Sequence, residues 1–200
     1  MRLSPAEFNA MNTRNRERLM SYEFRAFTKH IERHGIDLTG KEILDAGCGP
    51  GFSTVLIARH FRPSRLVAFD LMPEMIDIAT SRPALAEFYV KDIASTGFPA
   101  ESFDAVFIFD VLHHVPEWRE AVREMSRLLR PGGVLLAEEP ANQLTWFGDF
   151  FRMHHPVEAR FGWGEFRKEL REAGFEILGG SHLLLGAFRN YLCRKGSPSP

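Results

Sequence analysis

Four aspartates stand at the ends of apolar segments, and their positions are the first sign of a ligand site. They are Asp45, Asp70, Asp92 and Asp110. The carboxyl ends of parallel strands meet at one edge of an open sheet, and ligands of such sheets bind beyond that edge. A carboxylate there can accept paired hydrogen bonds from hydroxyl or amino groups, or it can simply cap the turn after its strand. Four carboxylates at one edge favour a small-molecule site.

A glycine-rich turn directly after Asp45 indicates where that ligand would meet the backbone. Gly47, Gly49 and Gly51 occupy alternate positions, and the helix-like segment Phe52–His60 follows them. Glycine lets a chain turn sharply and brings bare backbone against a bound molecule. Nicotinamide-binding folds also use such turns, but they carry a third glycine three residues after the second. That glycine is missing here, as is a recognisable set of groups for hydride transfer.

Two adjacent histidines, His113 and His114, follow Asp110 in a segment that ends before Pro116. Histidine titrates near neutral pH, so either side chain could take a proton from a reacting group or hydrogen-bond to it. Alternatively the pair packs against the turn and caps it, because polar groups inside proteins are usually satisfied by the protein itself. The sequence leaves both interpretations open.

Alternating patterns predict the elements that position these residues. Met20, Phe24, Phe27 and Ile31 recur at helical spacing, which predicts an amphipathic helix that ends at Gly35. From residue 41 onward, strand and helix patterns alternate, and this order predicts right-handed crossovers and a parallel sheet with helices on both faces. The predicted strands are 42–45, 65–70, 87–91, 103–109 and 134–138, and the predicted helices are 52–60, 73–81 and 117–129.

The last third of the chain has a different pattern. Residues 140–161 are rich in aromatic side chains without one clear period, namely Trp146, Phe147, Phe150, Phe151 and Phe161. The same segment contains His154 and His155, which are too isolated to indicate a site. A helix is predicted over 165–173, followed by two strands over 175–182 and 188–194, and Gly196–Pro200 is predicted to be a frayed tail.

Four stretches, in order, resemble the class I S-adenosylmethionine-dependent methyltransferases, and in particular their small-molecule branch. The run Ile43-Leu44-Asp45-Ala46-Gly47-Cys48-Gly49-Pro50-Gly51 is similar to the first motif of that family. The other stretches are 67–75, 103–115 and 128–136. They resemble, respectively, the ribose-binding strand end, the fourth strand with its turn, and the turn into the fifth strand. The resemblance covers about half of the chain.

The resemblance implies an α/β fold with a doubly wound, Rossmann-like, seven-stranded sheet. That sheet would be mostly parallel with an antiparallel last strand, and helices would cover both faces. The implied cofactor is S-adenosylmethionine. By resemblance, Asp70 would accept both ribose hydroxyls, while Asp92 and the backbone of Ile93 would hold the adenine amino group. Asp45 would orient the glycine turn or the cofactor's ammonium group.

The glycines would meet the methionine and ribose part of the cofactor, and two apolar residues would pack on the adenine ring. The complete set of cofactor-binding candidates is Asp45, Gly47, Cys48, Gly49, Gly51, Asp70, Leu71, Met72, Asp92, Ile93 and Asp110.

Methyl transfer itself asks little of side chains, because the sulfonium carbon is already activated and alignment supplies most of the rate. A base helps only where the acceptor must lose a proton, and His113 and His114 are the catalytic candidates for that role. Glu138 and Glu139, with Asp110, suggest a metal-dependent catechol-type site. Such a site is expected to have an Asp-Asn arrangement downstream, which is missing, and adjacent strand residues point to opposite faces. We therefore predict no metal.

The helical leader and residues 140–161 would form a lid over the acceptor in the resembled fold. An apolar lid suits an apolar or aromatic small molecule; alternatively, these side chains fill the core or a dimer interface. A nucleic-acid methyltransferase should show a Pro-Pro-aromatic motif after the fourth strand, where this chain has Asp110-Val111-Leu112. A different class of function is a non-catalytic S-adenosylmethionine-binding sensor or partner subunit.

Composition bounds the remaining expectations. The chain has 200 residues with 44% hydrophobic content and a net charge of −1, which suits one domain without a nucleic-acid partner. Cys48 and Cys193 fall in different elements, so we expect no disulfide and a cytoplasmic location. No apolar run has membrane-spanning length, and we expect no membrane partner. The predicted parts are a helical cap (1–40), a cofactor-binding core (41–139), an aromatic lid or insertion (140–161), a helix with a β-hairpin (162–195) and a tail (196–200).

Overall fold

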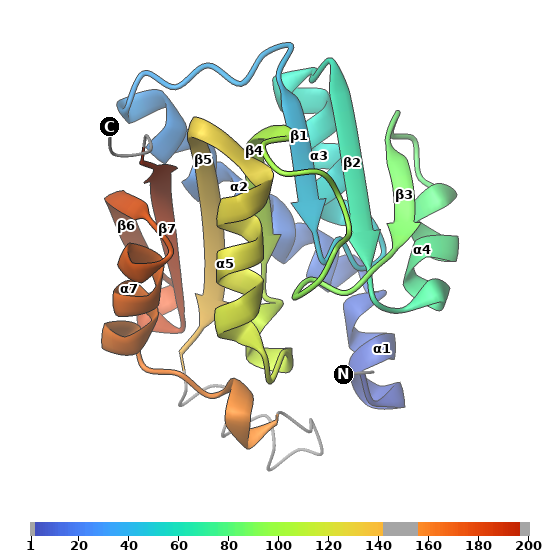
Figure 1. Ribbon diagram of the computed structural model, residues 1–200. Helices are drawn as coiled ribbons and strands as arrows, with labels where there is room; N and C mark the ends of the chain where they lie inside the picture. Colours follow the sequence, from blue (N-terminus) through green and yellow to red (C-terminus); the bar gives the residue numbers. More distant parts are fainter. Residues whose placement is uncertain (1–2, 142–155, 197–200) are drawn as a thin grey trace.

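A sheet of seven strands lies between two layers of helices in the computed structural model, which describes residues 3–141 and 156–196 (Figure 1). The strands are β1 (Glu42–Ala46), β2 (Arg65–Asp70), β3 (Glu87–Val90), β4 (Phe103–Phe109), β5 (Leu129–Pro140), β6 (Phe175–Leu183) and β7 (Phe188–Lys195). The helices are α1 (Pro5–Met11), α2 (Arg14–Arg33), α3 (Phe52–Phe61), α4 (Pro73–Thr80), α5 (Trp118–Leu128) and α7 (Trp163–Glu172). Three short 3-10 turns are η1 (Leu112–His114), η2 (Val157–Ala159) and η3 (Leu184–Gly186).

The strand order is β3-β2-β1-β4-β5-β7-β6, and it reverses between β1 and β4. The pairs among β1 to β5 are all parallel, whereas β7 runs antiparallel to both β5 and β6. The chain thus starts in the middle of the sheet and winds outward in both directions. This arrangement confirms the predicted fold class. Because strand order reverses between β1 and β4, a crevice for a ligand opens beyond their carboxyl ends.

Side chains of β4 alternate between two hydrophobic cores, as the period of a strand requires. Val106 and Ile108 face the layer formed by α5 and α7, which lies in front of the sheet in Figure 1. Phe107 and Phe109 face the opposite layer, formed by α2 and α3. Since β4 is buried on both faces, it forms a rigid base for the residues that follow it.

The predicted amino-terminal helix is confirmed as α2, whose side chains Met20, Phe24 and Phe27 pack into the core. Helix α1 lies within the predicted helical cap, but its separation from α2 was not predicted. Its start is a capping box in which the Ser4 hydroxyl accepts from the Glu7 N–H and the Glu7 carboxylate accepts from the Ser4 N–H. This motif satisfies two backbone donors at a helix start, and the sequence does contain its signature.

Strand β5 begins at Leu129, five residues before the predicted start at Val134. Leu129 pairs with Phe103, and the register then shifts before Ala105 pairs with Val134. The Pro-Gly-Gly segment (131–133) therefore forms an irregularity within the pairing of β4 and β5. We had predicted it to be a turn that precedes the strand.

In the last third, α7, β6 and β7 confirm the predicted helix and antiparallel pair. Phe161 lies in the core, with its ring centroid 4.5 Å from that of Trp118 and 5.0 Å from that of Phe166. It therefore fills the core and does not reach the cavity described below. The other aromatic residues and the histidines of this segment lie outside the described residues: Trp146, Phe147, Phe150, Phe151, His154 and His155.

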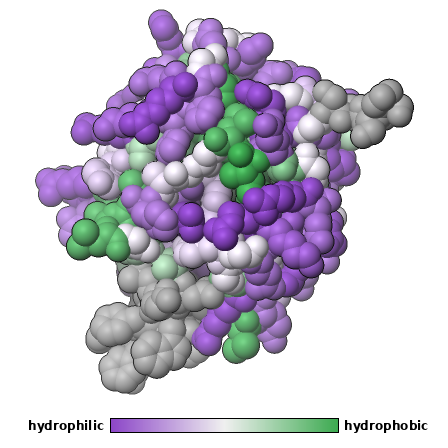
Figure 2. Space-filling view, turned by 90° about the vertical axis from the view of Figure 1, so that its left-hand side faces the viewer, coloured by the Kyte–Doolittle hydropathy of each residue, from purple (hydrophilic) through white to green (hydrophobic). Residues whose placement is uncertain are grey.

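Cys48 and Cys193 are buried free thiols, in agreement with the expectation of no disulfide between them. Among the residues that the structure describes, none of the helices has the length and apolar composition of a membrane-spanning segment. Figure 2 shows that the side of the molecule at the β6 edge is mostly hydrophilic, with small hydrophobic patches.

Candidate active site

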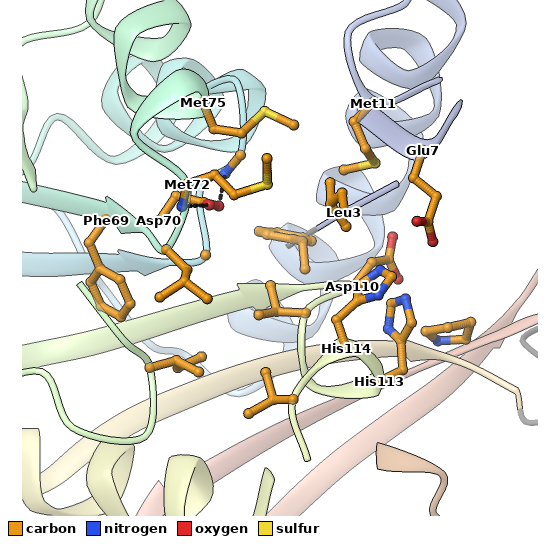
Figure 3. A pocket seen from close by; sticks show the side chains of 18 of the residues that line it. Leu3, Glu7, Met11, Phe69, Asp70, Met72, Met75, Asp110, His113 and His114 are labelled. Carbon is orange, nitrogen blue, oxygen red and sulfur yellow. Dashed lines mark hydrogen bonds between the residues drawn. The ribbon is translucent and has the colours of Figure 1, made fainter. Parts of the chain in front are cut away.

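A cavity of about 300 Å³ lies at the carboxyl end of the parallel strands. Its lining comes from the glycine turn after β1, the end of β2, the segments after β3 and β4, and the two amino-terminal helices. Figure 3 shows Asp70 and Met72 on one side of the cavity and His113 and His114 on the other. Small-molecule sites usually measure about 300–1,000 Å³. The cavity is thus large enough for a small ligand.

The glycine turn is fixed by backbone hydrogen bonds to the neighbouring strand. The N–H groups of Gly47 and Cys48 both donate to the Phe69 carbonyl at 2.9 Å. Gly47 has φ +74°, and a Cβ there would lie 2.5 Å from Cγ2 of Val111. Only glycine fits at this position, because any side chain would be strained and would clash.

Asp70 ties the glycine turn to the start of α4. Its Oδ2 accepts from the Gly49 N–H and its Oδ1 from the Met72 N–H, both at 2.9 Å. Burial raises the pKa of Asp70, while these backbone donors pull it down. The carboxylate lines the cavity, so it lies where the predicted contact with ribose hydroxyls requires it. That role stays a prediction.

Asp45 does not line the cavity. Its carboxylate is buried beneath the turn, where Oδ2 accepts from the hydroxyls of Ser53 at 2.7 Å and Thr54 at 2.6 Å. Burial raises its pKa to about 6, although both hydroxyl groups lower it. Asp45 therefore anchors the first turn of α3. Of its two predicted roles, this geometry favours orienting the glycine turn.

The residues predicted for the adenine end do come together. Leu71, Met72, Asp92 and Ile93 all line the cavity, although they come from two different segments. Asp92 Oδ1 accepts from the Ala94 N–H at 2.9 Å, which fixes the turn after β3. Asp92 can thus cap this turn and still face a ligand with its second oxygen.

A cluster of charged side chains lies at the other end of the cavity. Arg16 donates through Nη1 to Glu23 Oε2 at 2.7 Å and through Nη2 to Asp110 Oδ2 at 2.8 Å. Glu138 completes the cluster, with carboxylate oxygens of all three acids within 4.8 Å of one another. Glu23 and Glu138 are fully buried. Three acids thus share one guanidinium group.

Burial, together with this imbalance of charge, raises the pKa values of the acids. Burial, followed by repulsion from Asp110 and Glu23, raises the pKa of Glu138 to about 10. The pKa of Asp110 also lies well above its usual range, chiefly because of burial. Burial lowers the pKa of Arg16, but its two acidic partners more than offset that effect. The guanidinium group of Arg16 lies between Glu23 and Asp110. The expectation that the site holds no metal stays a prediction.

Glu139 points to the opposite face of β5 from Glu138, as predicted for neighbours in a strand. It accepts from three backbone N–H groups of the turn after β4: Val111 at 3.2 Å, Leu112 at 2.8 Å and His113 at 3.2 Å. It also lies 2.8 Å from Nδ1 of the His113 ring. Burial raises its pKa to about 8, and the backbone donors lower it.

Both candidate histidines line the cavity. Their ring centroids are 4.0 Å apart, and His113 lies against Glu139. The structure thus brings the predicted base candidates to the same cavity as most of the cofactor-binding candidates, whereas Asp45, Cys48 and Gly51 do not line it. It also adds a carboxylate partner that sequence analysis had not connected to them.

Sequence analysis missed Arg16, Glu23 and Glu7 as residues of the site. Arg16 and Glu23 are seven positions apart, so they fall on the same helical face as the buried Met20, and we had expected charged residues only around that face. The charged residues Arg16 and Glu23 on the apolar face of this helix were the signal that could have indicated a buried ion pair. Glu7 lines the cavity from α1, and its capping box was visible in the sequence.

Comparisons with known proteins agree with this geometry. Residues 44–137 match the family described as "Methyltransferase domain". The fatty-acid O-methyltransferase of Mycolicibacterium smegmatis is 36% identical over 102 residues, which cover 50% of this chain and 37% of that protein. A second protein of that organism, named as an S-adenosylmethionine-dependent methyltransferase, is 30% identical over 158 residues, covering 78% of this chain and 60% of its own length. The chain spans 37% to 60% of the length of the curated relatives it matches.

Solved structures show the same fold. A Haloferax volcanii methyltransferase, solved in complex with the Trm112 methyltransferase activator, aligns with a TM-score of 0.76 at 17% identity, covering 96% of this chain and 98% of that one. An S-adenosylmethionine-dependent methyltransferase from Mesorhizobium loti aligns with a TM-score of 0.67 at 18% identity, covering 80% and 93%. The matched family and the curated relatives support a class I S-adenosylmethionine-dependent methyltransferase, and the solved structures show the fold of such proteins.

Proposed function

We propose that the chain transfers the methyl group of S-adenosylmethionine to a small-molecule acceptor. One observation carries the proposal. A single cavity is lined at one end by the glycine turn with Asp70 and Asp92, and at the other by Asp110 and His113. A nucleotide-like group at the first end would thus bring its reactive part toward the second.

The residues of the first end fit S-adenosylmethionine. Gly47 and Gly49 present bare backbone to the cavity, and a Cβ on Gly47 would close the space toward Val111. Asp70 and Asp92 offer carboxylates to hydroxyl and amino groups. When bound, the cofactor supplies a methyl group that its sulfonium already activates.

The chain's own part is then to bind the cofactor, align the acceptor with its methyl group and enclose both. Alignment of an acceptor with the methyl carbon supplies most of the rate of such a transfer. Glu7 and Met11 of α1, with Leu3 just before that helix, close the cavity on the acceptor side (Figure 3). Their position would keep water away from the reacting groups.

Apolar side chains line the cavity beside its polar groups, among them Leu3, Met11, Leu19, Val115 and Phe188. Relatives are named for fatty acids, trans-aconitate, malonyl-[acyl-carrier protein] and ubiquinone biosynthesis. These names support a small-molecule acceptor, without selecting one compound.

Calorimetric titration with S-adenosylhomocysteine, the demethylated product of the cofactor, tests the proposal. Asp70→Ala removes an acceptor of charge-assisted hydrogen bonds, each worth about 1.5–3 kcal/mol. Affinity should fall at least about tenfold, which corresponds to about 1.4 kcal/mol. Circular dichroism checks that the variant is folded, because Asp70 also holds Gly49.

Asp37→Ala is the matched control. Asp37 also accepts a backbone N–H, that of Thr39 at 2.8 Å, but it does not line the cavity. The affinity of Asp37→Ala for S-adenosylhomocysteine should stay within about twofold of that of the unaltered protein. Such a change is smaller than the loss of one hydrogen bond would cause. Unchanged binding by a folded Asp70→Ala variant would contradict the proposed cofactor site. Product binding without transfer to any acceptor would favour the sensor function.

A further inference from the structure

Glu139 is built into the turn that carries His113. Its side chain is fully buried, and both of its carboxylate oxygens accept hydrogen bonds from backbone N–H groups of that turn. The same Oε2 that accepts from the His113 N–H also lies 2.8 Å from the ring nitrogen Nδ1. The carboxylate therefore fixes the backbone and the ring of His113 together.

This contact decides which nitrogen of His113 is basic. Burial raises the pKa of Glu139, but three backbone N–H groups already donate to its oxygens and lower it, so the geometry favours an accepting carboxylate with the shared proton on Nδ1. In that tautomer Nε2 is the nitrogen that can take a proton. His113 lines the cavity on the side opposite Asp70 and Met72 (Figure 3), so the basic nitrogen belongs to a residue of the acceptor end.

The charges around His113 disfavour an anionic acceptor. Acidic groups line this end of the cavity from several elements: Glu7 on α1, Asp110 after β4 and Glu117 beyond η1. Glu139 lies behind the His113 turn and does not line the cavity. His114 lies beside His113. The described cation at this end is Arg16, whose guanidinium binds Glu23 and Asp110. A carboxylate ligand would thus meet acidic groups at this end, where the guanidinium group of Arg16 is already bound by two acids.

From these two features we propose that the acceptor carries a dissociable proton, as a hydroxyl or amino group does, and that Glu139 positions His113 to remove it. The inference rests on the proposed function and narrows its acceptor class. A carboxylate acceptor is already deprotonated near neutral pH and needs no base, whereas a hydroxyl or amine does. His113 is the catalytic residue in this scheme, and Glu139 is its positioning residue.

In this methyl transfer one bond forms and one bond breaks. The acceptor's oxygen or nitrogen forms the new bond to the methyl carbon with its own electron pair. The pair of the broken carbon–sulfur bond returns to sulfur, which becomes neutral. The acceptor's proton passes to Nε2 of His113, and the imidazolium that results is stabilised by Glu139 at Nδ1.

Nuclear magnetic resonance of [15N]histidine-labelled protein tests the positioning role without any acceptor. Long-range proton–nitrogen correlations should show the Nδ1–H tautomer for His113 above its pKa, with His113→Gln and His114→Gln variants assigning the two rings. In Glu139→Gln the amide presents a donor where Oε2 was, so that tautomer preference should be lost. The titration midpoint should move by about one unit to lower pH, because an anionic neighbour is gone.

Glu120→Gln is the matched control, since Glu120 is an exposed side chain of α5 that does not line the cavity. It should leave the His113 tautomer and titration unchanged. A purely structural role of Glu139 would lower stability without moving the midpoint. An Nε2–H tautomer of His113 in the unaltered protein would overturn the positioning role, and this measurement does not depend on a variant that folds. An unmoved titration midpoint of His113 in Glu139→Gln would overturn it as well.

A pair of probes of the same shape tests the acceptor class. 4-Butylphenol and 4-butylbenzoate share one apolar tail and differ in whether the polar head is a hydroxyl or a carboxylate. Titrated into protein saturated with S-adenosylhomocysteine, the phenol should bind at least about tenfold more tightly, a difference of about 1.4 kcal/mol. Equal binding, no binding of either, or preference for the benzoate would overturn the acceptor class. Failure of the proposed function itself would appear earlier, as absent binding of S-adenosylhomocysteine.

Discussion

The two ends of the cavity are built by different means. At the cofactor end, backbone groups do most of the positioning, and the bond from Gly49 to Asp70 joins residues only 21 positions apart. At the acceptor end, charged side chains do it, and the bond from Arg16 to Asp110 joins residues 94 positions apart. The first end depends on the shape of a turn, whereas the second depends on a balance of buried charges.

This difference implies different kinds of failure. A turn fails when an added atom cannot fit, and no change of pH repairs that. A cluster of buried acids fails when its cation is removed, and protonation of the acids can repair it. Mutations at the two ends should therefore respond differently to pH.

The largest effect should come from Arg16→Met, which leaves Glu23, Asp110 and Glu138 without a cation. Loss of one partner from a buried charge cluster destabilises by about 3–5 kcal/mol. Urea denaturation at pH 7 measures the loss, and the deficit should shrink as pH falls and the acids take up protons. Arg65→Met is the control, because Arg65 and Glu87 form an exposed pair worth at most about 1 kcal/mol. Equal losses in both variants would mean that the cluster is not the stabilising unit we describe.

The next effect tests the cofactor end through Gly47→Ala. Its Cβ would meet Val111 at 2.5 Å, so overpacking should add about 1–3 kcal/mol to the strain of a positive φ. Gly132→Ala is matched for strain, since its φ is +79° with no atom near its Cβ. Thermal melts and calorimetry with S-adenosylhomocysteine should show a larger loss at Gly47 in both readouts, at every pH. A Gly47→Ala variant that behaves like Gly132→Ala would remove the steric argument for the turn.

A smaller effect, with a defined sign, is expected for Glu138→Gln. The pKa of Glu138 is about 10 in the folded chain and about 4.3 when unfolded. The folded state therefore binds more protons in this interval, and the unaltered protein loses stability as pH rises through it. Glutamine does not titrate, so the variant should match the protein near pH 4 and exceed it by at least about 1.4 kcal/mol at pH 9. Parallel stability curves from pH 4 to 9 would contradict the raised pKa.

The smallest effect is expected at Asp92, at the adenine end. Asp92→Asn keeps the shape but removes the charge, so cofactor affinity should fall by about fivefold, or about 1 kcal/mol. An S-adenosylhomocysteine analogue without the adenine amino group should bind the protein and the variant almost equally. If the variant still discriminates between the two ligands as the protein does, Asp92 serves only to cap the turn before Ala94.

The same contrast explains how far the sequence could predict the molecule. The parallel sheet, α2 and the glycine turn follow from local patterns, and these predictions of the fold are confirmed. Arg16 and Glu139 could not be assigned, because their partners lie on other elements and only packing brings them together. Asp45 shows the intermediate case, since its place at a strand end was visible but its hydroxyl partners on α3 were not.

The two adjacent glutamates of β5 give that strand a constraint of its own. Glu138 serves the charge cluster on one face and Glu139 serves the His113 turn on the other. A one-residue insertion in β5 would exchange the faces of both side chains at once. For protein engineering, substitutions can be explored around the cavity one by one, but the length of β5 between Val134 and Pro140 has to be left as it is. Libraries that vary acceptor preference should therefore place insertions in connecting loops, never in this strand.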